Sequence, residues 1–209
     1  MTDIGRALMG RPSNKEQRRK EITNALLTVM ARSGFENASI QAISKEAGLT
    51  GGLVHYHFKN KQEILVELIK VLHETAQTRY IELKSNVESA EDKLAAFVDS
   101  ALALGKGSNT DAVKAWVVIG AEAIKQDLVR KLYQEAIEFN LNELNELIEM
   151  YAQETGKSIS SESINNISAG VIGAIEGAYM LASTAPDVIP KDYAAATVKS
   201  MLFRTLENI

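Results

Sequence analysis

The stretch that decides the fold runs from Gly48 to Lys61 and reads GLTGGLVHYHFKNK. Two adjacent glycines weaken a helix by about 1 kcal/mol each relative to alanine, yet the sequence on both sides has helical periodicity. Two of the chain's three histidines follow, flanked by aromatic residues and then by two lysines. This mixture leaves three interpretations: a metal site, a phosphate-binding loop, or a surface that must approach a large polyanion closely.

Helical periodicity recurs along nearly the whole chain, and no segment alternates apolar and polar residues for long, so we expect an all-α protein. The first helix should cover about residues 14–32, because Ser13 and Glu16 have the spacing of a capping box and Gly34 provides a stop. Its apolar stripe consists of Ile22, Leu26, Val29 and Met30.

Two short helices follow, over about residues 39–48 and 50–57. Asn60 together with Glu63 then caps a long fourth helix that reaches about residue 86. Later helices are expected at about 90–105, 110–125, 127–154, 161–184 and 191–207, which makes about nine in all.

We expect two domains, covering residues 1–60 and 61–209. The third and fourth helices are joined across Phe58, Lys59 and Asn60 alone, which is too short for a flexible tether. The N-terminal domain (the head) should therefore move together with the C-terminal domain (the body).

Charge is unevenly distributed along the chain. Residues 1–61 contain ten Lys and Arg but only five Asp and Glu, whereas the other 148 residues contain 13 basic and 22 acidic groups. A basic head on an acidic body is expected when one end of a protein meets an anionic polymer. The alternative is chance clustering of basic residues on a solvated face.

Composition excludes several classes of protein. The chain has no cysteine, which rules out disulfides and thiolate metal sites. The N-terminus lacks the apolar core of a signal peptide, and no apolar run approaches the length needed to span a bilayer. We expect a cytoplasmic protein that does not associate with a membrane and needs no cofactor.

The two short helices, with a turn that contains Gly48, have the lengths and burial pattern of a helix-turn-helix. Such a unit lays its second helix in the major groove of DNA. Without side chains at Gly51 and Gly52, the backbone of that helix can approach the DNA closely. Ser39 and Thr50 stand at two helix starts, where a hydroxyl either caps the helix or contacts a phosphate.

The two other interpretations of the opening stretch fit worse. His55 and His57 are two residues apart, which on a helix points them about 200° apart, so they do not jointly bind one metal. A phosphate-binding P-loop requires Lys and then Ser or Thr after its last glycine, whereas Leu53 and Val54 follow Gly52. We therefore expect no metal site.

Residues 13–70 resemble the DNA-binding domain of the TetR family of bacterial repressors. The family pattern is Gly, an apolar residue, Ser or Thr, two variable residues, two apolar residues, two aromatic residues, His, Phe, a basic or small residue, and Lys. The chain follows it from Gly48 to Lys61, except that His55 stands where Tyr is commoner. The resemblance implies that Gly51, Gly52, Leu53 and His55 face the bases. It also implies that Ser39, Thr50, Tyr56, His57 and Lys61 face the phosphates, and that Val54 and Phe58 pack inward.

The family resemblance also implies a body that forms a homodimer. Residues 168–183, SAGVIGAIEGAYMLAS, contain a helix face stripped of large side chains, which lets another helix approach closely. We expect this face and the last helix to form a four-helix interface between two chains. Its expected residues are Gly170, Gly173, Ala174, Gly177, Ala178, Met201 and Leu202. Packing within one chain is the alternative.

Residues 111–133, DAVKAWVVIGAEAIKQDLVRKLY, resemble the betaine-regulator branch of the same family and contain the only tryptophan. The family's bodies bind a small molecule. The expected aromatic lining is Phe97, Trp116, Tyr133 and Tyr179, and Glu122 or Glu176 would meet a polar or cationic group. Packing in the core is the alternative for each of these residues.

No constellation of catalytic residues is present, so we do not expect an enzyme. We expect a homodimeric, ligand-responsive transcriptional regulator, a repressor that a small-molecule effector releases from a near-palindromic double-stranded DNA operator. The alternative is a helical small-molecule sensor or carrier without sequence-specific DNA binding.

Overall fold

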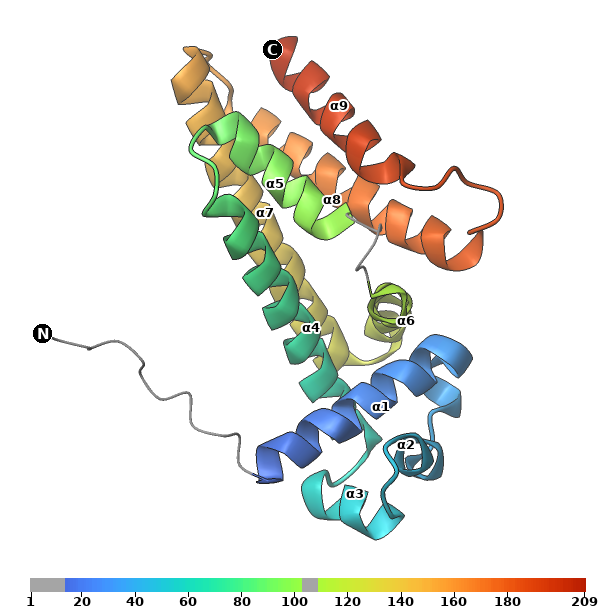
Figure 1. The fold of residues 1–209 in the computed structure, drawn as a ribbon. Helices are drawn as coiled ribbons and strands as arrows, with labels where there is room; N and C mark the ends of the chain where they lie inside the picture. Colours follow the sequence, from blue (N-terminus) through green and yellow to red (C-terminus); the bar gives the residue numbers. More distant parts are fainter. Residues whose placement is uncertain (1–13, 103–108) are drawn as a thin grey trace, which may run out of the picture.

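The computed structural model describes residues 14–102 and 109–209, and within these ranges the chain forms nine α-helices and no strands (Figure 1). The head contains α1 (Asn14–Asn37), α2 (Ile40–Glu46) and α3 (Gly51–His57). The helices that follow are α4 (Lys61–Lys84), α5 (Ala90–Leu102), α6 (Thr110–Lys125), α7 (Asp127–Thr155), α8 (Ser161–Thr184) and α9 (Tyr193–Glu207). The predicted all-α class is confirmed. Ser13 and residues 103–105, which were expected at helix ends, lie outside the described residues.

Hydroxyl side chains cap both helices of the helix-turn-helix. The Ser39 hydroxyl accepts a hydrogen bond from the backbone N–H of Ala42 at 3.1 Å, and the Thr50 hydroxyl accepts one from the N–H of Leu53 at 3.3 Å. Each bond satisfies one of the donors that a helix start leaves free. The capping role expected for both residues is confirmed, and both side chains remain exposed.

The link between α3 and α4 is fixed by local contacts. Asn60 accepts a hydrogen bond from the N–H of Glu63 at 2.9 Å, as its residue type predicts. The Glu63 carboxylate reaches back to the N–H of Lys59 at 2.7 Å, one residue before the donor of a standard capping box. Phe58 is only 1% exposed. Because every residue of the link makes a cap or core contact, α3 and α4 hold a defined angle.

The first helix is interrupted at Gly34, where φ is 76° and ψ is 167°. A residue with a side chain rarely adopts this positive φ, so glycine is needed here. The chain resumes helical geometry for one short turn, in which Phe35 is buried at 4% exposure. The predicted stop at Gly34 is therefore present as a kink that turns Phe35 into the core.

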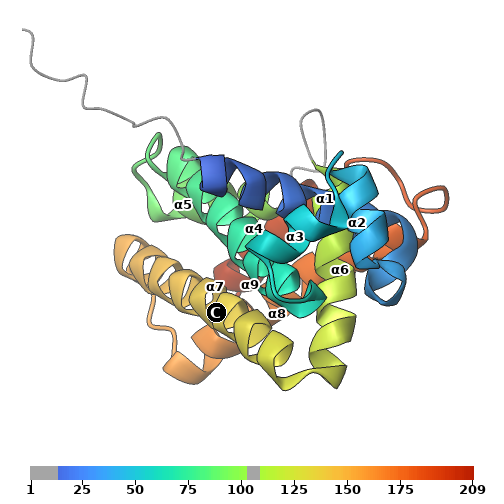
Figure 2. The same ribbon diagram turned by 90° about the horizontal axis from the view of Figure 1, so that it is seen from below.

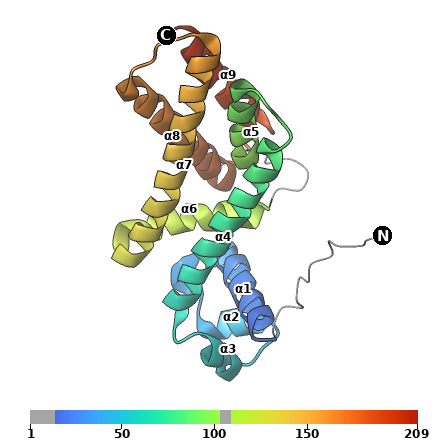
Figure 3. The same ribbon diagram turned by 90° about the vertical axis from the view of Figure 1, so that its left-hand side faces the viewer.

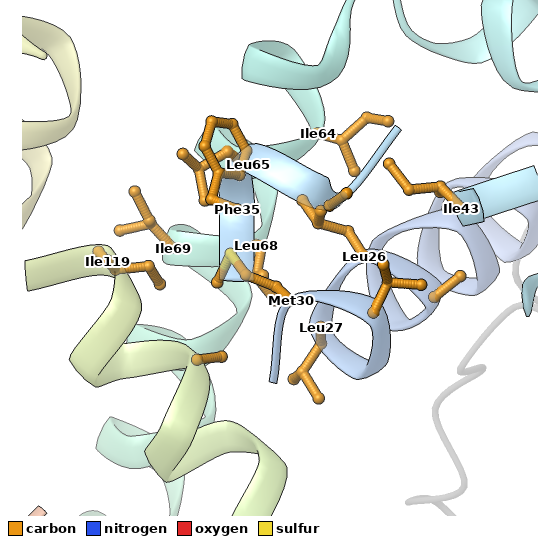
Figure 4. Packing of buried hydrophobic residues seen from close by; sticks show 14 of the residues in the cluster. Leu26, Leu27, Met30, Phe35, Ile43, Ile64, Leu65, Leu68, Ile69 and Ile119 are labelled. Atoms are coloured by element: carbon orange, nitrogen blue, oxygen red, sulfur yellow. The ribbon is translucent and has the colours of Figure 1, made fainter. Parts of the chain in front are cut away.

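Two hydrophobic cores divide the molecule. The first packs α1 and α3 against the N-terminal half of α4, together with residues of α6 and the start of α7. Figure 4 shows its centre, formed by Leu26, Leu27, Met30, Phe35, Ile43, Ile64, Leu65, Leu68, Ile69 and Ile119. The second lies among α5, α7, α8 and α9. A division at residue 60 stays a prediction, because burial assigns the first half of α4 to the core of the head.

The head and the tip of α9 lie at opposite ends of an elongated molecule (Figure 1). α4 leads from the head into the body beside α7, and α6 crosses between the two parts and packs on α1 (Figure 3). The body helices α4 and α6 are thus the ones in direct contact with the head.

α8 is long and apolar enough, by length and composition alone, to cross a membrane. This corrects the expectation that no segment approaches that limit. The same test is passed by core helices of soluble proteins, and α8 contributes Ile164, Ile172 and Ile175 to the second core. No membrane assignment therefore rests on it.

Candidate DNA-binding surface and ligand pocket

One side of α3 is open to solvent at the end of the molecule that faces the viewer in Figure 2. We call this side the recognition surface, and its residues are Thr50, Gly51, Gly52, Leu53, His55 and Tyr56. Tyr56 is 76% exposed, which is unusual for so large a ring. A Cβ placed on either glycine would meet no atom within 4 Å. The fold therefore does not require glycine at these two positions, and another molecule can approach the backbone there.

The opposite side of α3 faces the core of the head. Val54 is fully buried and Phe58 is only 1% exposed, as their spacing of four residues predicts. His57 is also buried, at 8% exposure, with its ring edge-to-face on Tyr56 at 5.0 Å between centroids. A phosphate contact by His57 stays a prediction, and the burial of its ring, on the side of the helix away from His55, does not favour it.

Lys61 makes contacts within the head. Its ammonium donates to the carbonyl oxygens of Phe35 at 2.7 Å and Glu36 at 3.2 Å, and lies 4.3 Å from the centre of the Phe35 ring. It therefore caps the C-terminal turn of α1, where a cation is favourable. Two of its three N–H donors are used in this way, and a phosphate contact by Lys61 stays a prediction.

The body contains a cavity of about 220 Å³ that five helices line, from α4 to α8. We call it the body pocket. Four of the six predicted ligand-binding residues line it: Phe97, Trp116, Glu176 and Tyr179. A fifth, Tyr133, touches the lining without being part of it.

Glu176 is a polar group of the body pocket whose two carboxylate oxygens both accept hydrogen bonds. One of its carboxylate oxygens accepts a hydrogen bond from the Trp116 ring N–H at 3.0 Å, and the other accepts one from the Tyr133 hydroxyl at 2.8 Å. The two aromatic rings stack, with centroids 5.0 Å apart and planes 27° apart. The carboxylate is therefore held by two neutral donors beside an aromatic surface.

The tyrosines near Glu176 stay protonated. Burial, followed by the charge of Glu176, raises the pKa of the Tyr133 hydroxyl far above its ordinary value. The same two causes raise the pKa of Tyr179, whose hydroxyl donates to the carbonyl oxygen of Ala101 at 2.8 Å. Both phenols thus act as neutral donors and leave the carboxylate as the local charge.

Glu122 does not line the body pocket, and a ligand contact by this residue stays a prediction. Its carboxylate is 4% exposed and accepts hydrogen bonds from Gln126 at 2.8 Å and Lys125 at 3.3 Å, both on the last turn of α6 or just beyond it. Lys125 also lies 3.5 Å from Glu36 of α1. Sequence reasoning had no means of telling which of two carboxylates on different helices would point inward.

The wall formed by α4 contains polar residues that were not among the predicted ligand contacts. His73 and Gln77 share a hydrogen bond of 2.8 Å, and His73 lies edge-to-face on Phe139 at 5.3 Å. Burial lowers the pKa of His73. Their positions one helical turn apart on α4 are the only sequence signal that would have placed them together.

Farther along α4, Tyr80 joins the body pocket to α7. Its ring packs edge-to-face on Phe97 at 5.3 Å, and its hydroxyl donates to Glu143 at 2.7 Å. Lys84 pairs with the same carboxylate. The C-terminal end of α4 is thus fixed to α7 by a Tyr–Glu–Lys cluster.

The small-residue face of α8 is exposed over Gly170, Gly173 and Gly177, and a Cβ at any of them would meet no atom within 4 Å. Met180 and Met201 lie exposed as well, at 48% and 58%. Ala178 and Leu202, which were also expected at a dimer interface, are buried within the chain at 4% and 2%. An interface role for these two residues stays a prediction, although packing within the chain already covers them.

Comparison with known proteins gives two matches to family models. Residues 22–68 match the model of bacterial regulatory proteins of the tetR family, and residues 90–207 match the C-terminal model of the BetI-type transcriptional repressor. The second match alone covers more than half of the chain. Together they include the whole recognition surface and the lining of the body pocket except for its α4 residues.

Individual relatives agree with these matches. The HTH-type transcriptional regulator BetI of Vibrio vulnificus is 23% identical over 191 residues, which cover 90% of this chain and 92% of that protein. A transcriptional regulator from Rhodococcus has a similar structure, with a TM-score of 0.77, 19% identity, and coverage of 91% and 96% of the two chains. A regulator from Saccharomonospora viridis, solved in complex with choline, gives a TM-score of 0.76, 21% identity, and coverage of 91% and 96%.

A helix-turn-helix head that is packed on a helical body with a ligand pocket defines a DNA-binding transcriptional regulator that responds to a ligand. More particularly, the chain belongs to the TetR family of bacterial regulators, with a body of the BetI type. It is a repressor in class and not an enzyme. The alternative of a carrier without DNA binding is not favoured.

Proposed function

We propose that the protein acts as a homodimer that binds a near-palindromic operator and leaves it when a small organic cation occupies the body pocket. The observation that carries this proposal is the carboxylate of Glu176, which two neutral donors hold in place beside stacked aromatic rings. We also propose that the protein acts in the bacterial cytoplasm, as its membership of this family of regulators implies.

The chemistry of the body pocket favours a cation. Neutral donors fix the Glu176 carboxylate without neutralising its charge, and the faces of Trp and Tyr attract cations further. Arg79 lies at the exposed edge of the pocket and already interacts within the chain, so it is not a free partner for an anion. A cavity of about 220 Å³ suits a small ligand. Choline, which the Saccharomonospora viridis regulator holds in its complex, is the first probe to use.

On the DNA side, we propose that Gly51, Gly52, Leu53 and His55 approach the base edges. Ser39, Thr50 and Tyr56 would contact phosphates, because all three side chains are exposed around the start and outer side of the helix-turn-helix. With two glycines and a leucine against the groove, hydrogen-bonded readout is sparse. Contact with thymine methyl groups and DNA shape should carry much of the specificity.

The exposed small-residue face of α8 supports the proposed dimer. Gly170, Gly173 and Gly177 let a second helix approach closely, and Met180 and Met201 add apolar area beside them. Two chains joined there present two copies of α3, which fits a palindromic site.

Coupling between the two sites would run through α4. Its N-terminal half belongs to the core of the head, and the helix supplies Leu72, His73, Ala76 and Tyr80 to the body pocket farther along. A ligand that binds better to one position of α4 shifts the spacing of the two heads and so changes operator affinity.

The proposal is tested by pairing choline with its neutral isostere, 3,3-dimethylbutan-1-ol. The DNA is a duplex that the protein itself selects from a random library, called the operator below. Binding is measured by calorimetry, and operator release by fluorescence anisotropy. We expect choline to bind at least about tenfold more tightly than the isostere, because only choline gains the carboxylate and aromatic attraction.

Equal binding of the two compounds would contradict a charge-selective pocket. Binding of choline without any change in operator affinity would instead contradict the coupling between pocket and head.

A further inference from the structure

Arg19, on the first half of α1, contacts three parts of the chain at once. One guanidinium nitrogen donates to the carbonyl oxygen of His57 at the end of α3, at 2.8 Å. Another donates to the Glu67 carboxylate of α4 at 2.9 Å. The guanidinium carbon lies 4.0 Å above the centre of the Phe58 ring, between those two helices. A single side chain thus bridges α1, α3 and α4.

Arginine is suited to this position by its geometry. Its planar group offers several donors in fixed directions and stacks on an aromatic face, whereas lysine offers one compact charge. The Arg19 side chain is only 24% exposed and that of Glu67 34% exposed, so solvent screens the pair less than it screens an open surface pair.

The recognition helix needs such a contact because it is short. α3 has seven residues, and its inward packing rests on Val54 and on the adjoining Phe58. Its first turn is held by the Thr50 cap and by the turn that precedes it. At the other end, the His57 carbonyl belongs to the group that a helix leaves without an intrahelical partner, and a cation there is favourable.

We infer that Arg19 is a positioning residue for DNA recognition, which fixes the angle between α3 and α4, and that it is not one of the phosphate-contacting cations of the basic head. The inference rests on the proposed placement of α3 against DNA. It also implies that Glu67, although acidic, favours the binding of DNA. Glu67 fixes the Arg19 guanidinium, which in turn fixes the end of α3.

This assignment predicts an effect opposite to simple electrostatics. Removing a negative charge near the head should strengthen DNA binding or leave it unchanged if only net charge matters. If Arg19 positions α3 through Glu67, then Glu67→Ala should weaken binding to the operator. Glu74→Ala is the matched control, since it removes the same charge from an exposed site two turns farther along α4.

The experiment compares Glu67→Ala, Glu74→Ala, Arg19→Gln and Arg19→Lys in the full chain, together with Lys20→Gln and Lys59→Gln. The last two remove exposed cations of the head, and Lys20 adjoins Arg19 on the same helix. For each variant, affinity for the operator and for a scrambled duplex is measured over a series of salt concentrations. Circular dichroism at the same temperature establishes that the variant is folded.

We expect Glu67→Ala to lower operator affinity by about tenfold, the loss typical of one charge-assisted hydrogen bond, with scrambled-duplex affinity unchanged or slightly higher. Arg19→Gln should lower operator affinity by about tenfold to a hundredfold without changing the slope of affinity against salt. Arg19→Lys should restore little of that loss. A phosphate-contacting lysine, by contrast, should lower both affinities and reduce the slope by about one.

Two outcomes would overturn the inference. One is a Glu67→Ala protein that binds the operator as tightly as Glu74→Ala does. The other is an Arg19→Gln protein that loses affinity for both duplexes alike, with a reduced salt slope, which would make Arg19 a phosphate contact. If Arg19→Gln does not fold, the Glu67 comparison still decides. A further variant, Gly52→Leu, distinguishes failure of this inference from failure of the proposed function. If α3 does not bind DNA at all, Gly52→Leu leaves operator binding unchanged.

Discussion

The recognition surface and the body pocket are built in opposite ways. The recognition surface consists of neighbours in the sequence, from Thr50 to Tyr56, on one short helix. The backbone of this helix is accessible at Gly51 and Gly52, which have no side chains. The body pocket draws its lining from five helices, over residues 72–179, and surrounds one fixed carboxylate with aromatic rings. The surface fits a ligand larger than itself, and the pocket encloses a ligand smaller than itself.

This difference determines how each site tolerates change. At the recognition surface, added bulk leaves the fold intact, and under the proposed function it blocks the approach of DNA to α3. In the body pocket, each lining residue also packs against its neighbours, so a change there acts on ligand affinity and stability together. Four variants test this difference between the two sites.

The largest effect is expected from Gly52→Leu. Its side chain would project from the recognition surface into the space that DNA should occupy, so operator affinity should fall at least about a hundredfold. Stability should hold or rise by about 0.5–1 kcal/mol, since leucine favours a helix over glycine and no atom lies within 4 Å of the new Cβ. Anisotropy and thermal unfolding measure the two quantities.

Gly52→Ala provides a graded control with an intermediate loss. Unchanged operator affinity in the leucine variant would mean that α3 is not at the groove.

Gly173→Arg should have the next largest effect, on the assembly that presents two recognition surfaces. The added side chain has free space in the single chain but not against a second copy of α8. Analytical ultracentrifugation should give the mass of one chain, and operator affinity should fall at least about tenfold because bivalent binding is lost.

Gln134→Arg, at an exposed position of α7, is the control and should remain dimeric. A dimeric Gly173→Arg protein would place the interface elsewhere.

Glu176→Gln should separate the body pocket from the recognition surface. The amide keeps the size of the side chain and removes its charge, so choline affinity should fall about tenfold, while operator affinity without choline stays within about twofold. Calorimetry and anisotropy report the two values.

The matched control is Glu135→Gln, an exposed carboxylate on α7. Equal loss in both variants would indicate long-range charge effects in place of a specific contact.

The smallest effect concerns pH and His73. Because burial lowers its pKa, the folded state favours the neutral ring, and the unfolded state takes up the proton first as pH falls. Stability should therefore decline as pH drops below about 6.5, the ordinary value for histidine, and continue to decline through the lower folded value.

Urea unfolding between pH 8 and pH 5 should show a shallower decline in His73→Gln than in the natural chain. Identical pH profiles would show that His73 titrates as an ordinary exposed histidine.

The contrast between the two sites also explains what could be predicted from sequence. Local rules were enough for the helix-turn-helix, since Ser39 and Thr50 cap their helices and Val54 and Phe58 face inward by spacing alone. Such rules also place His57 on the other side of the helix from His55, although the family pattern suggested a phosphate contact for His57.

The body pocket could be predicted only in part, because its geometry depends on how distant helices pack. Trp116 and Glu176 lie 60 positions apart in sequence and meet through a hydrogen bond. Glu122 sits on the same helix as Trp116 but points elsewhere, and neither composition nor periodicity distinguishes the two carboxylates. From the sequence, Arg19 is likewise only one cation among several in a basic head. Its contacts with His57 and Glu67 are visible only in the structure.

The continuity of α4 has a consequence for building chimeras and for insertions during evolution. One unbroken helix carries both Lys61, beside the head, and Tyr80, in the wall of the body pocket. Each residue added to or removed from an α-helix rotates everything beyond it by about 100° and shifts it by about 1.5 Å. A head grafted onto this body must therefore preserve the helical phase of α4, because a join that is off by a single residue would change the direction in which α3 faces.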